Sequence, residues 1–257
     1  MEWIVEDRGE VEVWTIDGDA RRNSITMAML AGLHAELARA AEKRTLRCVV
    51  LTGAGSRAFC AGADLKERAR MSAEQVHAFH GDLRAALRGV ESSPKVFVAA
   101  LNGAALGGGL ELALACDLRI MSASAELGLP EVGLGIIPGG GGTQRLARAI
   151  GVARAKDLVL TARRIDAVEA LAYGLVTRAA PPEKLRDAAL AMAGEVARNA
   201  PVSLRQAKRA IDGGFHLPLE EALDLENRMY QDCLATRDRQ EALRAFAEKR
   251  RPVFTGE

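Results

Sequence analysis

A single carboxylate interrupts an otherwise apolar stretch of the chain, LGGGLELALACD at residues 106–117. Glu111 follows three glycines and is surrounded by leucines and alanines. A carboxylate in such surroundings either pairs with a cation or acquires a raised pKa, and a raised pKa suits proton transfer near neutral pH. Arg119 and Arg145 are candidate partners, so the sequence leaves both a structural ion pair and an acid/base role open.

A second isolated carboxylate, Glu131, lies between Pro130 and Val132 in a glycine-rich apolar segment, residues 127–146. Two carboxylates with apolar neighbours can divide acid and base roles between them, because their surroundings set different pKa values. We therefore take Glu111 and Glu131 as a candidate pair that handles one proton or one water molecule.

Two segments of small residues could present backbone N–H groups to a ligand. They are FCAGADLKE (59–67) and NGAALGGGLELA (102–113), and each follows a predicted strand. Unpaired N–H groups at a helix N-terminus carry positive potential, so two such segments could together bind one oxyanion. For the first segment, a tight turn before a helix capped by Asp64 is an equally open interpretation.

Several other motifs do not support the chemistry they resemble. GAGSRA (53–58) mimics a dinucleotide fingerprint, but FCAGADL follows in place of an immediate helix. PGGGGTQR (138–145) lacks the lysine of a phosphate loop and indicates a tight turn before a helix. The serines lack a GxSxG context. No metal is expected, because no histidine has a second ligand at metal spacing; the histidines are His34, His77, His80 and His216.

Bulk properties place few constraints on function. The 257 residues carry 35 Lys and Arg against 34 Asp and Glu, so no overall charge recruits nucleic acid or a membrane surface. The first residues resemble no signal peptide, and no apolar run could span a membrane, so we expect a cytoplasmic protein. The cysteines lack paired spacing and are expected to be small core residues; they are Cys48, Cys60, Cys116 and Cys233.

The order of elements predicts an α/β fold. Residues 11–16 alternate like a half-buried strand, whereas 47–52 and 95–101 are predicted as strands covered on both faces. Helices alternate with them; Thr26 is the expected cap of one, and Ser72 with Gln75 forms the capping box of another. Residues 166–174 and 181–198 are predicted as further helices.

The sequence NAP (199–201) is the strongest boundary signal. Three helices are predicted after it, the last opened by a capping box of Asp238 and Glu241. A helical tail of about fifty residues cannot build a core of its own. We expect residues 1–195 to form the core and residues 196–257 to pack on it or on another subunit.

Ordered motifs along the whole chain resemble the enoyl-CoA hydratase (crotonase) superfamily. They run from RRNSIT (21–26) through FCAGADLKE, NGAALGGGLELALACD, PEVGLGIIPGGGGTQRL and ALAYGLV to AFAEKRRPVFTGE. The sequence is most similar to the branch containing 3-methylglutaconyl-CoA hydratase. This resemblance implies a ClpP-like spiral of ββα repeats. It also implies a C-terminal helical segment that packs in a homotrimer, with two trimers forming a hexamer.

The resemblance also implies roles for particular residues. Ala63 and Gly108 match the residues whose N–H groups bind the thioester oxygen, and Glu111 and Glu131 match the two hydratase glutamates. The implied reaction hydrates a trans-2-enoyl-CoA with Glu111 as base and Glu131 as acid, and needs no cofactor beyond the coenzyme A of the substrate. The implied coenzyme A contacts are Arg22, Ala61, Ala63, Asp64, Leu65, Lys66 and Gly108, with Arg21 as an alternative to Arg22.

Two other functions stay open. The resemblance allows a branched or carboxylated substrate such as 3-methylglutaconyl-CoA. Some members of the branch bind AU-rich RNA, but the segment best placed to do so, residues 36–47, mixes acidic and basic residues and has no aromatic side chain for base stacking. We therefore expect an acyl-CoA partner and no nucleic acid.

Overall fold

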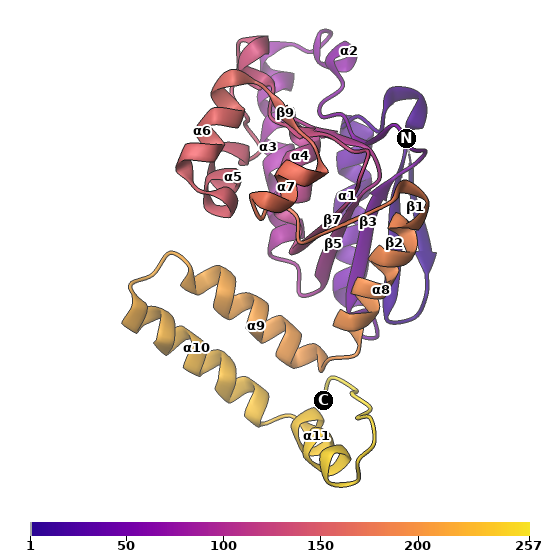
Figure 1. The fold of residues 1–257 in the computed structure, drawn as a ribbon, viewed down its shortest axis with the longest axis vertical. Helices are drawn as coiled ribbons and strands as arrows, with labels where there is room; N and C mark the ends of the chain where they lie inside the picture. The colour runs from indigo at the N-terminus through magenta and orange to yellow at the C-terminus, as the bar shows by residue number, and fades with distance from the viewer. Residues whose placement is uncertain (1) are drawn as a thin grey trace.

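The computed structural model describes residues 2–257 and contains two β-sheets surrounded by helices (Figure 1). The larger sheet has strand order β1-β2-β3-β5-β7-β10 and the smaller sheet β4-β6-β8-β9. The strands are β1 Glu2–Asp7, β2 Val11–Asp17, β3 Cys48–Gly53, β4 Ala58–Cys60, β5 Val96–Leu101, β6 Ala104–Leu106, β7 Leu118–Ser122, β8 Leu127–Gly128, β9 Arg164–Ile165 and β10 Arg178–Ala180.

Successive strand pairs divide between the two sheets. β3, β5 and β7 join the larger sheet, and the strand that follows each of them, β4, β6 or β8, joins the smaller one. Neighbouring strands of these pairs run parallel within each sheet. The chain therefore advances as a spiral of ββα turns, which confirms the predicted fold. The short strands of the smaller sheet are not predicted from the sequence.

The helices are α1 Met27–Glu42, α2 Leu65–Arg68, α3 Ala73–Glu91, α4 Gly108–Ala115, α5 Gly142–Ile150, α6 Val152–Thr161, α7 Ala167–Ala172, α8 Leu185–Ala197, α9 Pro201–Gly214, α10 Leu219–Leu234 and α11 Arg237–Ala247. Short 3₁₀ turns cover Asp19–Arg21, Glu131–Leu134 and Pro182–Lys184. The Thr26 cap and the Ser72–Gln75 capping box are both present as predicted.

Both faces of the larger sheet are covered. On strand β3, Val49 and Leu51 face the core beneath the other helices, while Cys48 and Val50 face a second core closed by α8. This alternation follows from the two-residue period of a strand. Cys48, Cys60 and Cys116 are buried as expected, whereas Cys233 is half-buried.

Strand β2 differs from its prediction as a half-buried strand, because Glu12 is fully buried. Its carboxylate accepts hydrogen bonds from Trp14 Nε1 at 2.8 Å, Lys43 Nζ at 2.9 Å and Arg39 Nη1 at 3.0 Å. These donors compensate for burial and lower the Glu12 pKa to about 2. The strand therefore buries a charge that its alternating pattern assigned to solvent.

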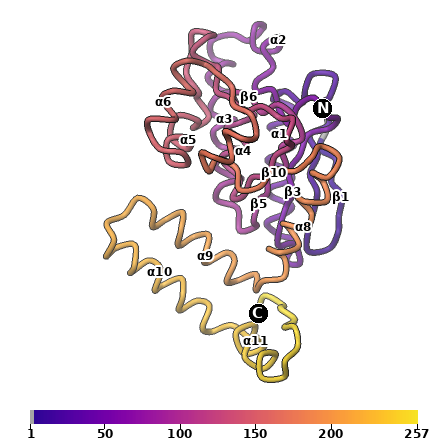
Figure 2. Tube along the Cα trace, viewed as in Figure 1, coloured from indigo at the N-terminus to yellow at the C-terminus, as the bar shows by residue number. Residues whose placement is uncertain are grey.

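The helices after α8 extend away from the rest of the chain (Figure 1). α9 and α10 pack against each other as a hairpin, and α11 follows with the C-terminal residues folded back beside it (Figure 2). We call residues 201–257 the C-terminal arm. Its helices match the three predicted from the sequence.

The prediction of a capping box of Asp238 and Glu241 at the start of α11 is wrong. Thr236 caps this helix by accepting a hydrogen bond from the Arg239 N–H at 3.2 Å. Asp238 instead accepts from the N–H groups of Thr255 and Gly256, and Glu241 from that of Val253. The two carboxylates therefore hold the C-terminal residues against α11.

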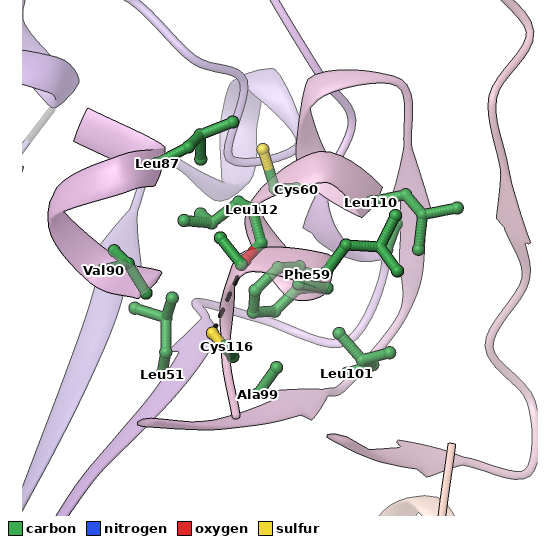
Figure 3. Close-up of a cluster of buried hydrophobic side chains, with 14 of the residues drawn as sticks. Leu51, Phe59, Cys60, Leu87, Val90, Ala99, Leu101, Leu110, Leu112 and Cys116 are labelled. Carbon is green, nitrogen blue, oxygen red and sulfur yellow. Dashed lines mark hydrogen bonds between the residues drawn. The ribbon is translucent and has the colours of Figure 1, made fainter. Parts of the chain in front are cut away.

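Helix α4 lies in the middle of the main apolar core (Figure 3). Its Leu110 and Leu112 pack among side chains from β3, β4, α3 and β5, and the thiol of Cys116 lies 3.5 Å from the Leu112 carbonyl oxygen. Every residue of α4 is buried. Surroundings this crowded fix the position of Glu111, the one charged side chain on the helix.

Candidate active site

Glu111 and Glu131 both line one cavity of about 700 Å³. The side chains are nearly buried, with 2% of Glu111 and 8% of Glu131 exposed. Glu111 comes from the first turn of α4, and Glu131 opens the 3₁₀ turn that follows Pro130. The structure therefore brings together the two carboxylates that the sequence singled out.

Glu111 is held by backbone groups and not by a cation. Its Oε1 accepts a hydrogen bond from the Gly142 N–H at 2.8 Å. Burial raises its pKa, and the N–H groups of Gly142 and Gly140 partly oppose that rise. The alternative interpretation, a structural ion pair of Glu111, is therefore wrong. Arg119 donates to backbone carbonyls, and Arg145 pairs with Glu91 at 2.7 Å.

Glu131 has fewer partners than Glu111. Among the residues that the structure describes, no group hydrogen-bonds to its buried Oε2. Burial raises the Glu131 pKa to about 7, and the negative charge of Glu111 adds to the rise. The two carboxyls therefore interact electrostatically. Glu131 is suited to keep a proton near neutral pH, whereas Glu111 is better stabilised as an anion.

The backbones of Ala63 and Gly108 lie close together in the cavity that holds these carboxylates. A β-carbon built on Gly108 would lie 3.8 Å from the Ala63 nitrogen. Gly108 is the first residue of α4, where N–H groups have no partner within the helix. Both residues line the cavity with Glu111 and Glu131. The arrangement can present two donors to one oxygen atom, as expected for an oxyanion hole.

Close backbone approach explains the glycines around Ala63 and Gly108. Gly62 adopts a φ of +87°, and a β-carbon there would lie 2.8 Å from the Leu106 carbonyl oxygen. A β-carbon on Gly109 would overlap the Cys60 carbonyl oxygen. The two small-residue segments therefore fit together because neither carries side chains at the point of contact.

The sequence did not reveal what the glycines at 139–142 do. They were expected to form a tight turn before a helix, and α5 does begin at Gly142. A β-carbon would lie 2.6 Å from Glu111 Oε2 if built on Gly140, and 2.9 Å from Oε1 if built on Gly142. These glycines leave the space that the carboxylate occupies. We call residues 138–142 the glycine loop.

His80 was also missed as a residue of the site. The sequence excludes it only as a metal ligand, yet it lines the cavity and its Nε2 lies 2.8 Å from the Gly139 carbonyl oxygen. The signal that could have found it is weak, because nothing in the local sequence of α3 connects it with a loop about sixty residues later.

A second and larger cleft, of about 1050 Å³, adjoins the first at Ala61, Ala63 and Leu65. Arg21, Arg22, Asp64 and Lys66 line this second cleft, so the residues expected to contact coenzyme A gather along one path; Gly108 lines the smaller cavity. Of the two arginines, Arg21 has its guanidinium 3.6 Å from the Asp64 carboxylate.

Asp64 and its neighbours also have structural contacts. The Asp64 carboxylate accepts hydrogen bonds from the N–H groups of Lys66 at 2.9 Å and Glu67 at 3.1 Å, so it caps α2. The Ala61 N–H donates to the Arg22 carbonyl. The turn-and-cap interpretation of this segment is therefore confirmed, and it places the Ala63 N–H at the junction of the two cavities.

Within residues 2–257, no group of three or more histidine, cysteine, aspartate or glutamate side chains is arranged to hold a metal ion. No helix in the same part of the chain combines the length and apolarity needed to cross a lipid bilayer.

Comparison with known proteins shows the family to which this chain belongs. The family model described as enoyl-CoA hydratase/isomerase matches residues 6–257. A short-chain-enoyl-CoA hydratase of Clostridium acetobutylicum is 40% identical over 96% of this chain and 95% of its own. The mitochondrial methylglutaconyl-CoA hydratase of Homo sapiens is 42% identical over 98% of this chain and 75% of its own.

A crystal structure of an enoyl-CoA hydratase from Bacillus anthracis superposes with a TM-score of 0.98, at 46% identity and with all of both chains covered. The spiral fold is that of the crotonase-type enzymes. This chain belongs to the enoyl-CoA hydratase/isomerase family.

Proposed function

We propose that this protein is an enoyl-CoA hydratase, which adds water across the double bond of a trans-2-enoyl-CoA to give a 3-hydroxyacyl-CoA. The observation that carries the proposal is the meeting of two nearly buried carboxyls, Glu111 and Glu131, in one cavity beside two clustered backbone N–H groups. Relatives named as enoyl-CoA hydratases support the same reaction class.

The first step is polarisation of the substrate thioester in the oxyanion hole. The N–H groups of Ala63 and Gly108 bind the thioester oxygen and stabilise the negative charge that develops there as an enolate forms. Electron density drawn toward this oxygen leaves C3 of the substrate open to attack by water. Both donors belong to backbone fixed by packing, so little reorganisation accompanies the charge development.

The carboxyls divide the proton transfers. The N–H groups of the glycine loop stabilise Glu111 as an anion. Glu111 removes a proton from a water molecule while the oxygen of that water bonds to C3 of the substrate. Glu131, whose pKa is raised to about 7, donates its proton to C2. The net change is the addition of one water molecule, and a proton exchange through solvent returns both carboxyls to their starting states.

Coenzyme A occupies the larger cleft in this proposal. Arg22 or Arg21 binds the phosphates, while Ala61, Asp64, Leu65 and Lys66 border the path of the pantetheine arm toward Ala63. Since coenzyme A is part of the substrate, we propose that the reaction needs no other cofactor.

Loss of the enoyl-thioester absorbance during incubation with crotonyl-CoA tests the proposal. We expect hydration by the wild-type protein without added metal or cofactor and in the presence of EDTA. Glu111→Gln and Glu131→Gln preserve side-chain shape but remove proton transfer, so each lowers kcat by about 100-fold or more. Near-normal turnover by either variant would contradict the role assigned to that residue.

A carboxylated acyl group is a second candidate substrate. Besides His80, the basic side chains of Arg68, His77 and Arg84 line the cavity that holds the carboxyl pair, and each could approach a carboxylate at the far end of the acyl group. The rat and human relatives named as methylglutaconyl-CoA hydratases support a substrate of this kind. Parallel kcat/KM measurements with crotonyl-CoA, longer enoyl-CoA and 3-methylglutaconyl-CoA decide between an unsubstituted and a carboxylated acyl group.

We also propose that the C-terminal arm mediates a homotrimer, two of which form a hexamer. Large apolar side chains on the arm are exposed, among them Ile211 at 70%, Phe215 at 64% and Leu219 at 71%. The arm's helices have no sheet of their own to cover these side chains.

A further inference from the structure

We propose that His80 is a positioning residue for Glu111, acting through the single peptide group that joins Gly139 to Gly140. His80 Nε2 lies 2.8 Å from the Gly139 carbonyl oxygen. A carbonyl oxygen can only accept a hydrogen bond, so the proton of this contact belongs to Nε2. His80 therefore holds the carbonyl end of the peptide group.

Glu111 lies at the other end of the same peptide group. In a trans peptide the C=O and the N–H point in opposite directions, and the described residues contain no cis peptide bond. Gly140 lies against the Glu111 carboxylate, since a β-carbon built on it would lie 2.6 Å from Glu111 Oε2. Its N–H lowers the Glu111 pKa, and the charge of His80 itself adds to this effect. Donation by His80 to the carbonyl also polarises the N–H, because hydrogen bonds in a chain strengthen one another.

The glycine loop needs such a contact because its own residues do not fix its backbone. Glycine has more conformational freedom than any other residue, and Gly139 and Gly140 are adjacent. Arg145 fixes the next peptide group, since its Nη1 lies 2.8 Å from the Gly140 carbonyl oxygen while its guanidinium pairs with Glu91. His80 and Glu91 both belong to α3, so one helix orients two successive peptide groups of the loop.

Substitution of His80 tests the proposal, which rests on the proposed function for its kinetic readout. His80→Leu removes the donor, and we expect kcat to fall about tenfold with KM little changed. The Glu111 pKa rises when an oriented N–H is lost, so the acidic limb of the kcat profile moves to higher pH. His80→Gln restores an N–H donor and recovers part of both effects.

His34→Ala is the matched control. His34 also contacts α3, through Asp82 at 2.9 Å, but it does not line the cavity. We expect this variant to keep both kcat and the position of the acidic limb. Two results for His80→Leu would overturn the positioning role. One is an acidic limb of the kcat profile at the wild-type pH, and the other is a defect seen only as a raised KM.

An infrared titration of the carboxyl band tests the same proposal without catalysis. The Glu111 signal is the difference between spectra of each protein and of its Glu111→Gln counterpart. We expect a higher Glu111 pKa in His80→Leu than in the wild type, and a value between them in His80→Gln; equal values would overturn the proposal. If the wild type fails to hydrate enoyl-CoA while this pKa shift is observed, the proposed function falls and the positioning role stands.

Discussion

Two carboxyls of the same chemical type acquire different properties in this cavity because their backbone surroundings differ. The Gly142 N–H donates to Glu111, whereas Oε2 of Glu131 is buried without a partner among residues 2–257. A hydrogen bond to the charged form favours ionisation, and burial without one opposes it. This difference at single oxygen atoms supports the proposed roles of Glu111 as base and Glu131 as acid.

The pH dependence of kcat/KM should report this difference. Glu131 must keep its proton, so activity falls as pH rises through a macroscopic pKa near 7, the value to which burial raises this carboxyl. Glu111 must lose its proton, which gives the limb at lower pH. Initial rates with crotonyl-CoA across the pH range, at constant ionic strength, measure both limbs.

The glutamine variants identify the limbs. The residual activity of Glu131→Gln should no longer fall near pH 7, and that of Glu111→Gln should lose the limb at lower pH. If the alkaline limb persists unchanged in Glu131→Gln, a group other than Glu131 must cause that limb.

At the scale of elements, the glycine loop and the start of α4 have to meet without side chains between them. Gly140→Ala places a β-carbon 2.6 Å from Glu111 Oε2, so the carboxylate must move. We expect kcat to fall by about 100-fold, the scale of a misplaced reacting group. Gly133→Ala is the control, since a β-carbon there would have no neighbour within 4 Å and its φ is not positive. Equal turnover in the two variants would show that the loop tolerates displacement.

Strand β2 and helix α1 are joined by the buried carboxylate of Glu12. Glu12→Ala removes the buried carboxylate that Arg39 and Lys43 share. Each cation keeps a second carboxylate partner and reaches solvent, so we expect the free energy of unfolding to drop by about 2 kcal/mol, less than for an uncompensated buried charge. Chemical denaturation measures the change. Glu10→Ala, which removes an exposed carboxylate from the same hairpin, should cost less than about 1 kcal/mol.

The pH dependence of stability gives a second test of Glu12. Its pKa is lowered from 4.5 to about 2 on folding, so its stabilising contribution is complete above about pH 4.5 and is lost as pH falls toward 2. The gap in stability between the wild type and Glu12→Ala should therefore narrow over that range. A gap independent of pH would mean that packing, and not charge, carries the effect.

Elements with a strong local pattern could be predicted from the sequence. The caps at Thr26 and Ser72 and the dense strands β3 and β5 were all predicted correctly, because contacts within a few residues determine them. The smaller sheet was not, since strands of two or three residues leave too short a pattern to read.

The site shows the same division. Glu111 and Glu131 stand out as isolated carboxylates in apolar sequence, and Ala63 and Gly108 were assigned through the family resemblance. His80 could not be predicted, because its partner Gly139 lies 59 residues away and is contacted through backbone alone. The burial of Glu12 was missed for a related reason, since its partner Arg39 lies on α1, 27 residues away.

At the scale of the whole molecule, the C-terminal arm extends away from the rest of the chain (Figure 1), and several of its large apolar side chains are exposed. Ile211→Glu combined with Phe215→Glu places one charge on α9 and one at its C-cap, and we expect the assembly to dissociate toward monomers in sedimentation velocity. Ile4→Glu on the edge strand β1 is the control and should leave the assembly unchanged. A wild-type protein that sediments as a monomer would contradict the proposed trimer outright.

The junction of the two cavities at Ala61, Ala63 and Leu65 has a consequence for inhibitor design. Small fragments that bind each cavity weakly could be joined by a linker passing Ala63. Binding of one fragment then raises the effective concentration of the other, so the joined compound gains affinity without new contacts. A carbonyl mimic in that linker would also meet the two backbone donors, which makes this junction the natural place to start a screen.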